Sequence, residues 1–108
     1  MQETENIRKE SSTLSSKRPP RILVVDDDGR LRDLLRQFLT NNGFHVSVAE
    51  DANQMNRLWM RERFDAVILD VMMPGEDGIS ILKRIRASND NTPILMLTAK
   101  GEDIDRIL

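Results

Sequence analysis

The chain has 108 residues, no cysteine and a formal net charge of −2, so it is long enough for one domain and has no disulfide framework. No apolar run approaches the ~20 residues that a membrane span needs, and the polar N-terminus lacks the apolar centre of a signal peptide, which predicts a cytoplasmic protein that does not bind membranes. The near-neutral charge argues against nucleic-acid binding by this segment itself.

Residues 1–20 are rich in Glu, Ser, Thr, Lys and Arg. We expect a disordered N-terminal extension here, because such a segment cannot bury enough apolar surface to offset the entropy lost on ordering. The rest, residues 21–108, is expected to form a single domain. It opens with the apolar run 22–25, which fits a strand buried on both faces of a parallel sheet.

An amphipathic helix is predicted next, because apolar residues recur at the spacing i, i+3, i+4, i+7 and i+8. These residues are Leu31, Leu34, Leu35, Phe38 and Leu39. Asp28 is placed to cap the start of this helix, and Gly43 is placed where its end favours a left-handed residue. The alternating residues 44–49 predict a second strand.

The second half repeats this pattern. A second helix is predicted after Asp51, with Met55, Leu58 and Trp59 on one face. Residues 66–69 predict a third buried strand, which ends at an acid, and a turn rich in helix breakers follows at 73–78. A third helix is predicted next, and its apolar stripe is formed by Ile79, Ile81, Leu82 and Ile85. Pro93 then precedes a fourth predicted strand at 94–97, which ends at Thr98.

Alternation of strands and helices in the order βαβαβαβ predicts an α/β fold with a doubly wound parallel sheet and helices on both faces. In a flavodoxin-like sheet the strand order is 2-1-3-4, which makes the first and third strands neighbours. Ligands bind such sheets beyond the carboxyl ends of the strands. The residues that follow the strands are therefore the candidate site.

Those residues are mostly acidic. Asp26, Asp27 and Asp28 follow the first strand, Asp70 ends the third and Thr98 ends the fourth. Carboxylates gathered at one sheet edge repel one another, and a divalent cation relieves the repulsion; an all-oxygen site suits Mg²⁺. Any single Asp after a strand is more simply explained as a helix cap, as Asp28 is expected to be. The prediction of a metal site therefore rests on the acids taken together and not on any one of them.

Phosphoryl transfer to an aspartate requires a bound divalent metal ion and a free carboxylate beside it, and such a site would supply both. Three segments, 22–28, 67–78 and 93–100, resemble the motifs of bacterial response-regulator receiver domains, which have the CheY-like, flavodoxin-like fold. The spacings of 44 residues from Asp26 to Asp70 and 28 from Asp70 to Thr98 also match. The resemblance covers residues 21–108, and the turns at 26–32, 74–78 and 98–102 are most similar to the OmpR subfamily.

The resemblance implies a role for each matching residue. Asp70 would be the phosphoacceptor, and Thr98 the switch hydroxyl that follows the phosphoryl group. Asp27 would bind Mg²⁺ (or Mn²⁺) directly and Asp26 mainly through water, with Asp70 and the backbone carbonyl of Met72 as further ligands.

The resemblance also implies partners and rate-modulating positions. A sensor histidine kinase would supply the phosphoryl group and could dock on the first helix, near Arg30, Arg32 and Arg36. Receivers would then pair as a homodimer, and DNA would be bound only through a C-terminal domain absent from these residues. Met72 and Lys100 resemble positions that modulate phosphorylation and hydrolysis rates.

Receiver domains continue with a fifth strand that carries a lysine at the site, and with a fifth helix, whereas this sequence stops at Leu108, inside the expected fourth helix. One alternative is therefore a truncated, non-phosphorylatable module that pairs with a full-length regulator through an exposed fourth strand. Another is a phosphatase, since Asp26 and Asp28 have the spacing of an aspartyl nucleophile and its acid. That alternative leaves Asp70 unexplained.

Two further features have ordinary interpretations. Trp59 is expected to pack in the core or at its rim. Arg57, Arg61 and Arg63 lie among apolar positions of the second helix and are expected to form a solvated face.

Overall fold

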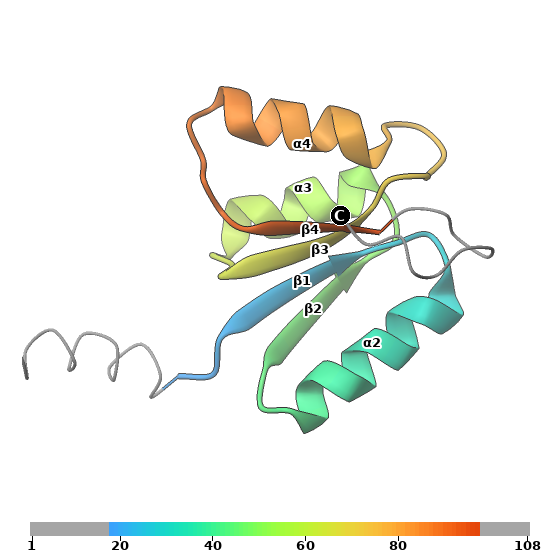
Figure 1. Ribbon diagram of the computed structural model, residues 1–108, viewed down its shortest axis with the longest axis vertical. Coiled ribbons are helices and arrows are strands. Elements are labelled where there is room, and N and C mark those ends of the chain that lie inside the picture. The colour runs from blue at the N-terminus through green and yellow to red at the C-terminus, as the bar shows by residue number, and fades with distance from the viewer. Residues whose placement is uncertain (1–17, 98–108) are drawn as a thin grey trace, which may run out of the picture.

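The computed structural model describes residues 18–97. Seven elements alternate along this part of the chain (Figure 1). They are β1 (Arg21–Val25), α2 (Gly29–Asn41), β2 (His45–Ala49), α3 (Ala52–Arg61), β3 (Ala66–Asp70), α4 (Gly78–Ala87) and β4 (Ile94–Leu97). Most of the predicted N-terminal extension lies outside the described residues, as do Thr98, Lys100 and the expected start of a further helix.

The four strands form one parallel sheet in the order β2-β1-β3-β4. This order confirms the predicted flavodoxin-like arrangement. Because β1 and β3 are the two inner strands, their short apolar sequences are buried; Leu23, Val24 and Val25 of β1 are fully shielded from solvent. The pairing of Val25 with Leu69 brings the ends of these two strands to the same level.

Helices cover both faces of the sheet, α3 and α4 on one side and α2 on the other (Figure 1). The main core lies on the α3/α4 side, where alternate strand residues meet side chains from the two helices. Its buried residues are Leu23, Val25, Ala49, Met55, Val67, Leu69, Met73, Ile81, Ile85 and Met96. No helix of the described part is long and apolar enough to span a membrane.

The start and end of α2 follow the predicted capping chemistry. Asp28 accepts hydrogen bonds from the backbone N–H groups of Arg30 and Leu31, at 3.0 and 3.3 Å. At the other end Gly43 has φ +92°, and the Phe44 N–H donates to the Leu39 carbonyl at 3.1 Å, the pattern of a Schellman motif. The second strand therefore begins one residue later than predicted.

The apolar stripe predicted for α2 is only partly buried. Leu34 and Phe38 remain 62% and 61% exposed, and α2 contains no fully buried residue. The reason is its position: α2 packs against β2 and β1 at one side of the sheet. The stripe is therefore wider than the surface that the helix meets among the described residues.

Candidate functional site

Three carboxylates meet at the carboxyl end of the sheet. Asp26 follows β1 and Asp70 ends β3, and these neighbouring strands end level with each other. Ligand oxygens from Asp26, Asp27 and Asp70 all lie within 4.8 Å of one another. The structure thus brings together the acids that the strand order predicted.

Backbone amides orient the two buried members of this acid cluster. Asp26 is fully buried and its Oδ1 accepts a hydrogen bond from the Asp28 N–H at 2.9 Å. Asp70 is 1% exposed and its Oδ1 accepts from the Met72 N–H at 3.0 Å. Each carboxylate is therefore held by the turn that follows its own strand, whereas Asp27 is exposed to solvent.

A cavity of about 440 Å³ lies beside Asp27. It is open to solvent and is lined by the loops that follow β1, β2 and β3 and by the first part of α3, which meet at this end of the sheet. Its lining residues are Asp27, Glu50, Asp51, Ala52, Asn53, Asn56, Pro74, Gly75 and Glu76. Gly75 has φ +79°, a conformation that L side chains rarely adopt, so the loop after β3 turns where the sequence provides a glycine.

The first residue of α4 packs directly behind Asp70. A Cβ atom added at Gly78 would clash with the Asp70 carbonyl oxygen and would lie 2.8 Å from the Val71 Cα. The Gly78 N–H also donates to the Val71 carbonyl at 3.0 Å. The absence of a side chain at this position therefore lets α4 begin against the backbone of the acid cluster.

The remaining predicted site residues are placed as follows. Asp28 caps α2 and is not one of the three clustered acids. Met72 is 61% exposed directly after the cluster. Thr98 and Lys100 lie outside the described residues.

Sequence reasoning missed the position of Arg32. We predicted Arg32 on a docking face, but its Nη1 donates to the backbone carbonyl of Asp26 at 2.8 Å, and its Nη2 lies 4.0 Å from Glu50. One turn into the helix that Asp28 caps, Arg32 points back toward the strand end. The position of Arg32, four residues after the cap Asp28, is the sequence signal that could have identified this contact. Arg32 therefore places a positive charge beside the acid cluster.

This fold and this set of acids define a class of protein. Residues 22–107 match the family model of the response regulator receiver domain, and the chain belongs to this family. Protein PetR from Rhodobacter capsulatus is 49% identical over 94 residues, 87% of this chain and 39% of that protein. Response regulator MprA from Mycolicibacterium vanbaalenii is 45% identical over 89 residues, 82% of this chain and 38% of that protein. The chain spans about two fifths of the length of these relatives.

Solved structures with the same fold confirm the CheY-like architecture. The receiver domain of the Francisella response regulator 1452 has a TM-score of 0.71 and 35% identity, over 80% of this chain and 71% of that one. TrrA from Thermotoga maritima, solved in complex with Mg(2+)-BeF, has a TM-score of 0.70 and 35% identity, over 76% of this chain and 71% of that one.

Proposed function

We propose that this chain accepts a phosphoryl group on Asp70 in a two-component phosphorelay. The observation that carries the proposal is the acid cluster: a buried carboxylate at the end of β3 with two more carboxylates within 4.8 Å. A buried, backbone-oriented Asp beside other acids is suited to take up a group that requires charge neutralisation. In this proposal the chain is a self-phosphorylating switch and not a turnover enzyme.

The donor set fits a hard divalent cation. Carboxylate oxygens from Asp26, Asp27 and Asp70 match the ligand preference of Mg²⁺ or Mn²⁺, and the backbone carbonyl of Met72 would complete the protein ligands. The Mg²⁺ in the TrrA complex supports this assignment. When bound, the cation would neutralise negative charge on the transferring phosphoryl group.

The chain's own residues would act as follows. The hydrogen bond from the Met72 N–H to Asp70 Oδ1 holds the carboxylate in place before the reaction. A carboxylate oxygen of Asp70 forms a bond to phosphorus while the bond from phosphorus to the donor imidazole nitrogen breaks, and the released imidazole takes a proton from water. The Thr98 hydroxyl would donate to a phosphoryl oxygen and report the modification, while Met72 and Lys100 would set its rates.

The partners follow from this role. A sensor histidine kinase would dock over α2, where Arg30, Leu34 and Phe38 are exposed. The phosphorylated receiver would pair with a second receiver, and a DNA-binding domain of the longer protein would regulate transcription in the cytoplasm. The similarity of the turns to the OmpR subfamily supports this output.

Incubation with acetyl phosphate and Mg²⁺, followed by intact-mass spectrometry, tests the proposal. We expect the mass of one phosphoryl group to be added, and we expect no addition after Asp70→Asn or when the metal is chelated. Arg30→Gln, a variant on the exposed side of α2, provides the matched control and should retain the labelling. Labelling that survives Asp70→Asn with the fold intact by circular dichroism would contradict the assignment of Asp70.

A second candidate function rests on β4. Among residues 18–97, β4 pairs only with β3, so its other edge has free backbone hydrogen-bonding groups within this part of the chain. In that case the chain would be a non-phosphorylatable module that pairs with a full-length regulator. Light scattering of the chain with and without a full-length receiver distinguishes the two, because only the module forms a complex when no phosphoryl donor is present.

A further inference from the structure

The outer surface near the end of α3 is basic and lies at the opposite end of the sheet from the acid cluster. Arg57, Met60 and Arg61 are exposed and share one side of α3 at the i, i+3 and i+4 spacing, and Arg63 follows the helix. We call these four residues the arginine surface. Met60 is 84% exposed, which makes it the most exposed of the large apolar side chains among residues 18–97.

The cations of the arginine surface have no carboxylate within ion-pair distance among residues 18–97. Four other arginines of the same part of the chain do have carboxylate partners at 3.0–4.0 Å: Arg21, Arg32, Arg36 and Arg84. The neighbouring Glu62 is already engaged by Arg21 at 3.2 Å. The arginine surface therefore retains charge that an external anion can neutralise.

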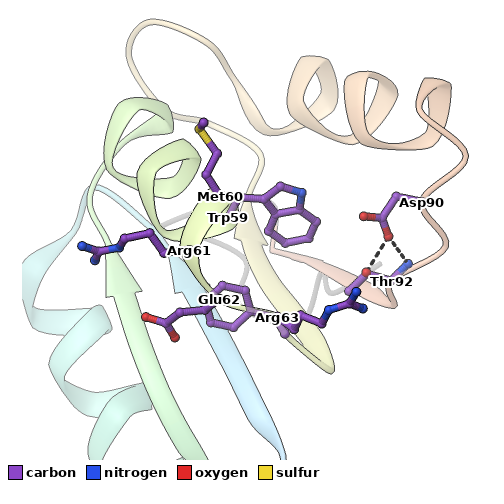
Figure 2. A pocket seen from close by; sticks show the side chains of 8 residues that line it. Trp59, Met60, Arg61, Glu62, Arg63, Asp90 and Thr92 are labelled. Carbon is purple, nitrogen blue, oxygen red and sulfur yellow. Dashed lines mark hydrogen bonds between the residues drawn. The ribbon is translucent and has the colours of Figure 1, made fainter.

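A cavity of about 480 Å³ adjoins the arginine surface (Figure 2). Trp59 and Phe64 stack with their ring centroids 6.0 Å apart and contribute its aromatic wall. Figure 2 shows the indole of Trp59 extending toward Asp90 and Thr92, while the guanidinium groups of Arg61 and Arg63 point to opposite sides. The cavity beside the arginine surface is therefore open to solvent and is lined by both aromatic and charged residues.

The far wall of this cavity is formed by Asp90 and Thr92 (Figure 2). Thr92 donates two hydrogen bonds to Asp90 Oδ1, from its hydroxyl at 2.6 Å and its N–H at 3.0 Å. These bonds lower the pKa of Asp90, with smaller contributions from the charges of Arg86 and Arg63. Asp90 thus faces Arg63 as a carboxylate and moderates its charge, which leaves Arg57 and Arg61 as the main cations.

The composition of this surface identifies the chemistry of its partner. Arginine, methionine and tryptophan are the residues enriched at protein–protein interfaces, whereas lysine is depleted there. An exposed methionine among the arginines is poorly suited to the phosphate backbone of nucleic acids, and the chain as a whole carries a net charge of −2. Charge complementarity requires an acidic partner.

We propose that the arginine surface docks an acidic partner protein, whose carboxylates pair with Arg57, Arg61 and Arg63 around a central contact with Met60. Because α3 is ten residues long, its two ends are about 15 Å apart, and α3 begins beside the cavity at Asp27. A partner at the end of α3 would leave the acid cluster accessible. Docking would therefore be compatible with either state of Asp70.

Trp59 is the only tryptophan of the chain, so its fluorescence reports directly on this surface. The full chain is titrated with a set of short synthetic peptides in which Glu and Asp alternate with Leu at different spacings. Neutral analogues with Gln and Asn, a duplex DNA and vesicles of anionic lipid serve as competing probes. We expect a saturable change in Trp59 emission with an acidic peptide, weakened by added salt, and none with its neutral analogue.

Two charge-reversal variants separate this surface from general attraction. R57E/R61E should weaken binding of the acidic peptide by about tenfold or more. R30E/K83E changes the net charge equally at exposed positions on α2 and α4 and should leave the affinity within about twofold. Circular dichroism and thermal unfolding establish that both variants fold as the parent does.

The proposal is overturned by equal binding of the neutral analogue, by tighter binding of DNA or vesicles, or by R57E/R61E binding as well as R30E/K83E. Absence of a saturable response to every peptide of the set also overturns it. Because no phosphoryl donor is present, these outcomes are independent of whether Asp70 is a phosphoacceptor.

Discussion

The two faces of the sheet are packed very differently in the described part of the chain. On the α3/α4 face, alternate strand residues meet Met55, Ile81 and Ile85 in a continuous core. On the α2 face, the helix covers β1 and β2, while Leu95 of β4 stays 42% exposed and Leu34 of α2 is 62% exposed. An apolar residue on the α3/α4 face is therefore expected to contribute more to the free energy of folding than one on the α2 face.

Truncation of one helical residue on each face should give the largest contrast. Ile81 of α4 is fully buried, so Ile81→Ala is expected to lower the free energy of unfolding by about 3 kcal/mol. Leu34→Ala removes an exposed side chain and improves helix propensity, so its effect should stay within about 0.5 kcal/mol. Urea unfolding measures both, and similar losses at the two positions would show that the α2 face is as well packed as the other.

The glycines that begin α2 and α4 provide the next contrast. Gly78→Ala places a methyl group against the Asp70 carbonyl and should destabilise by about 2 kcal/mol, besides displacing the acid cluster. At Gly29 the nearest atom to an added Cβ is the flexible Arg32 Nη2 at 3.4 Å, so Gly29→Ala should be neutral or stabilise by about 0.5 kcal/mol. Thermal unfolding of both variants checks this, and a stable Gly78→Ala protein would contradict the close approach.

Loss of an N-cap should accelerate hydrogen exchange over a longer stretch in α2, which is less buried, than in α4. Asp28→Ala and Asp77→Ala each remove an N-cap, at a cost of about 1 kcal/mol. Because α4 is also anchored by Ile81 and Ile85, we expect hydrogen exchange to accelerate throughout α2 in the first variant and only in the first turn of α4 in the second. Equal acceleration in both helices would argue against a difference between the faces.

The smallest effect concerns the turn between α4 and β4. The pKa of Asp90 lies below its ordinary value of 3.8, chiefly because of the Thr92 hydroxyl. Asp90 therefore stabilises the fold above pH 3.8, and this contribution is lost as the pH falls through the folded-state pKa. Thr92→Val should raise the pKa toward 3.8 and flatten this part of the pH dependence. NMR titration of the carboxyl carbon measures the pKa of Asp90. An unchanged pKa in the Thr92→Val variant would show that groups other than the Thr92 hydroxyl lower it.

The order of the elements could be predicted because helices and buried strands have different apolar patterns, namely the i, i+3, i+4 spacing and the short continuous run. The strand order followed from the flavodoxin-like arrangement that such an alternation favours. Short apolar runs such as 22–25 and 66–69 predict buried parallel strands, and this topology alone brings Asp26 and Asp70 to one edge. The caps Asp28 and Asp51 were also predictable, because their side chains satisfy the first backbone N–H groups of helices whose apolar spacing is clear.

Other features depend on tertiary geometry that periodicity does not contain. The extent to which α2 overhangs the sheet decides the exposure of Leu34 and Phe38, and the apolar stripe carries no information on it. Asn89, two residues beyond the end of α4 at Ala87, has φ +62° at a position where glycine is the usual signal. The contact of Arg32 with the Asp26 carbonyl depends on where the helix lies relative to the strand end.

Charge is separated along the direction of the strands, since the acid cluster lies at the carboxyl end and the arginine surface at the other. An anion that approaches the domain therefore meets negative charge at the acid cluster and positive charge at the arginine surface. Higher ionic strength should speed the encounter of anionic phosphoryl donors with the carboxyl end and slow the encounter of acidic proteins with the opposite end. A single change of salt would thus shift the two association rates in opposite directions.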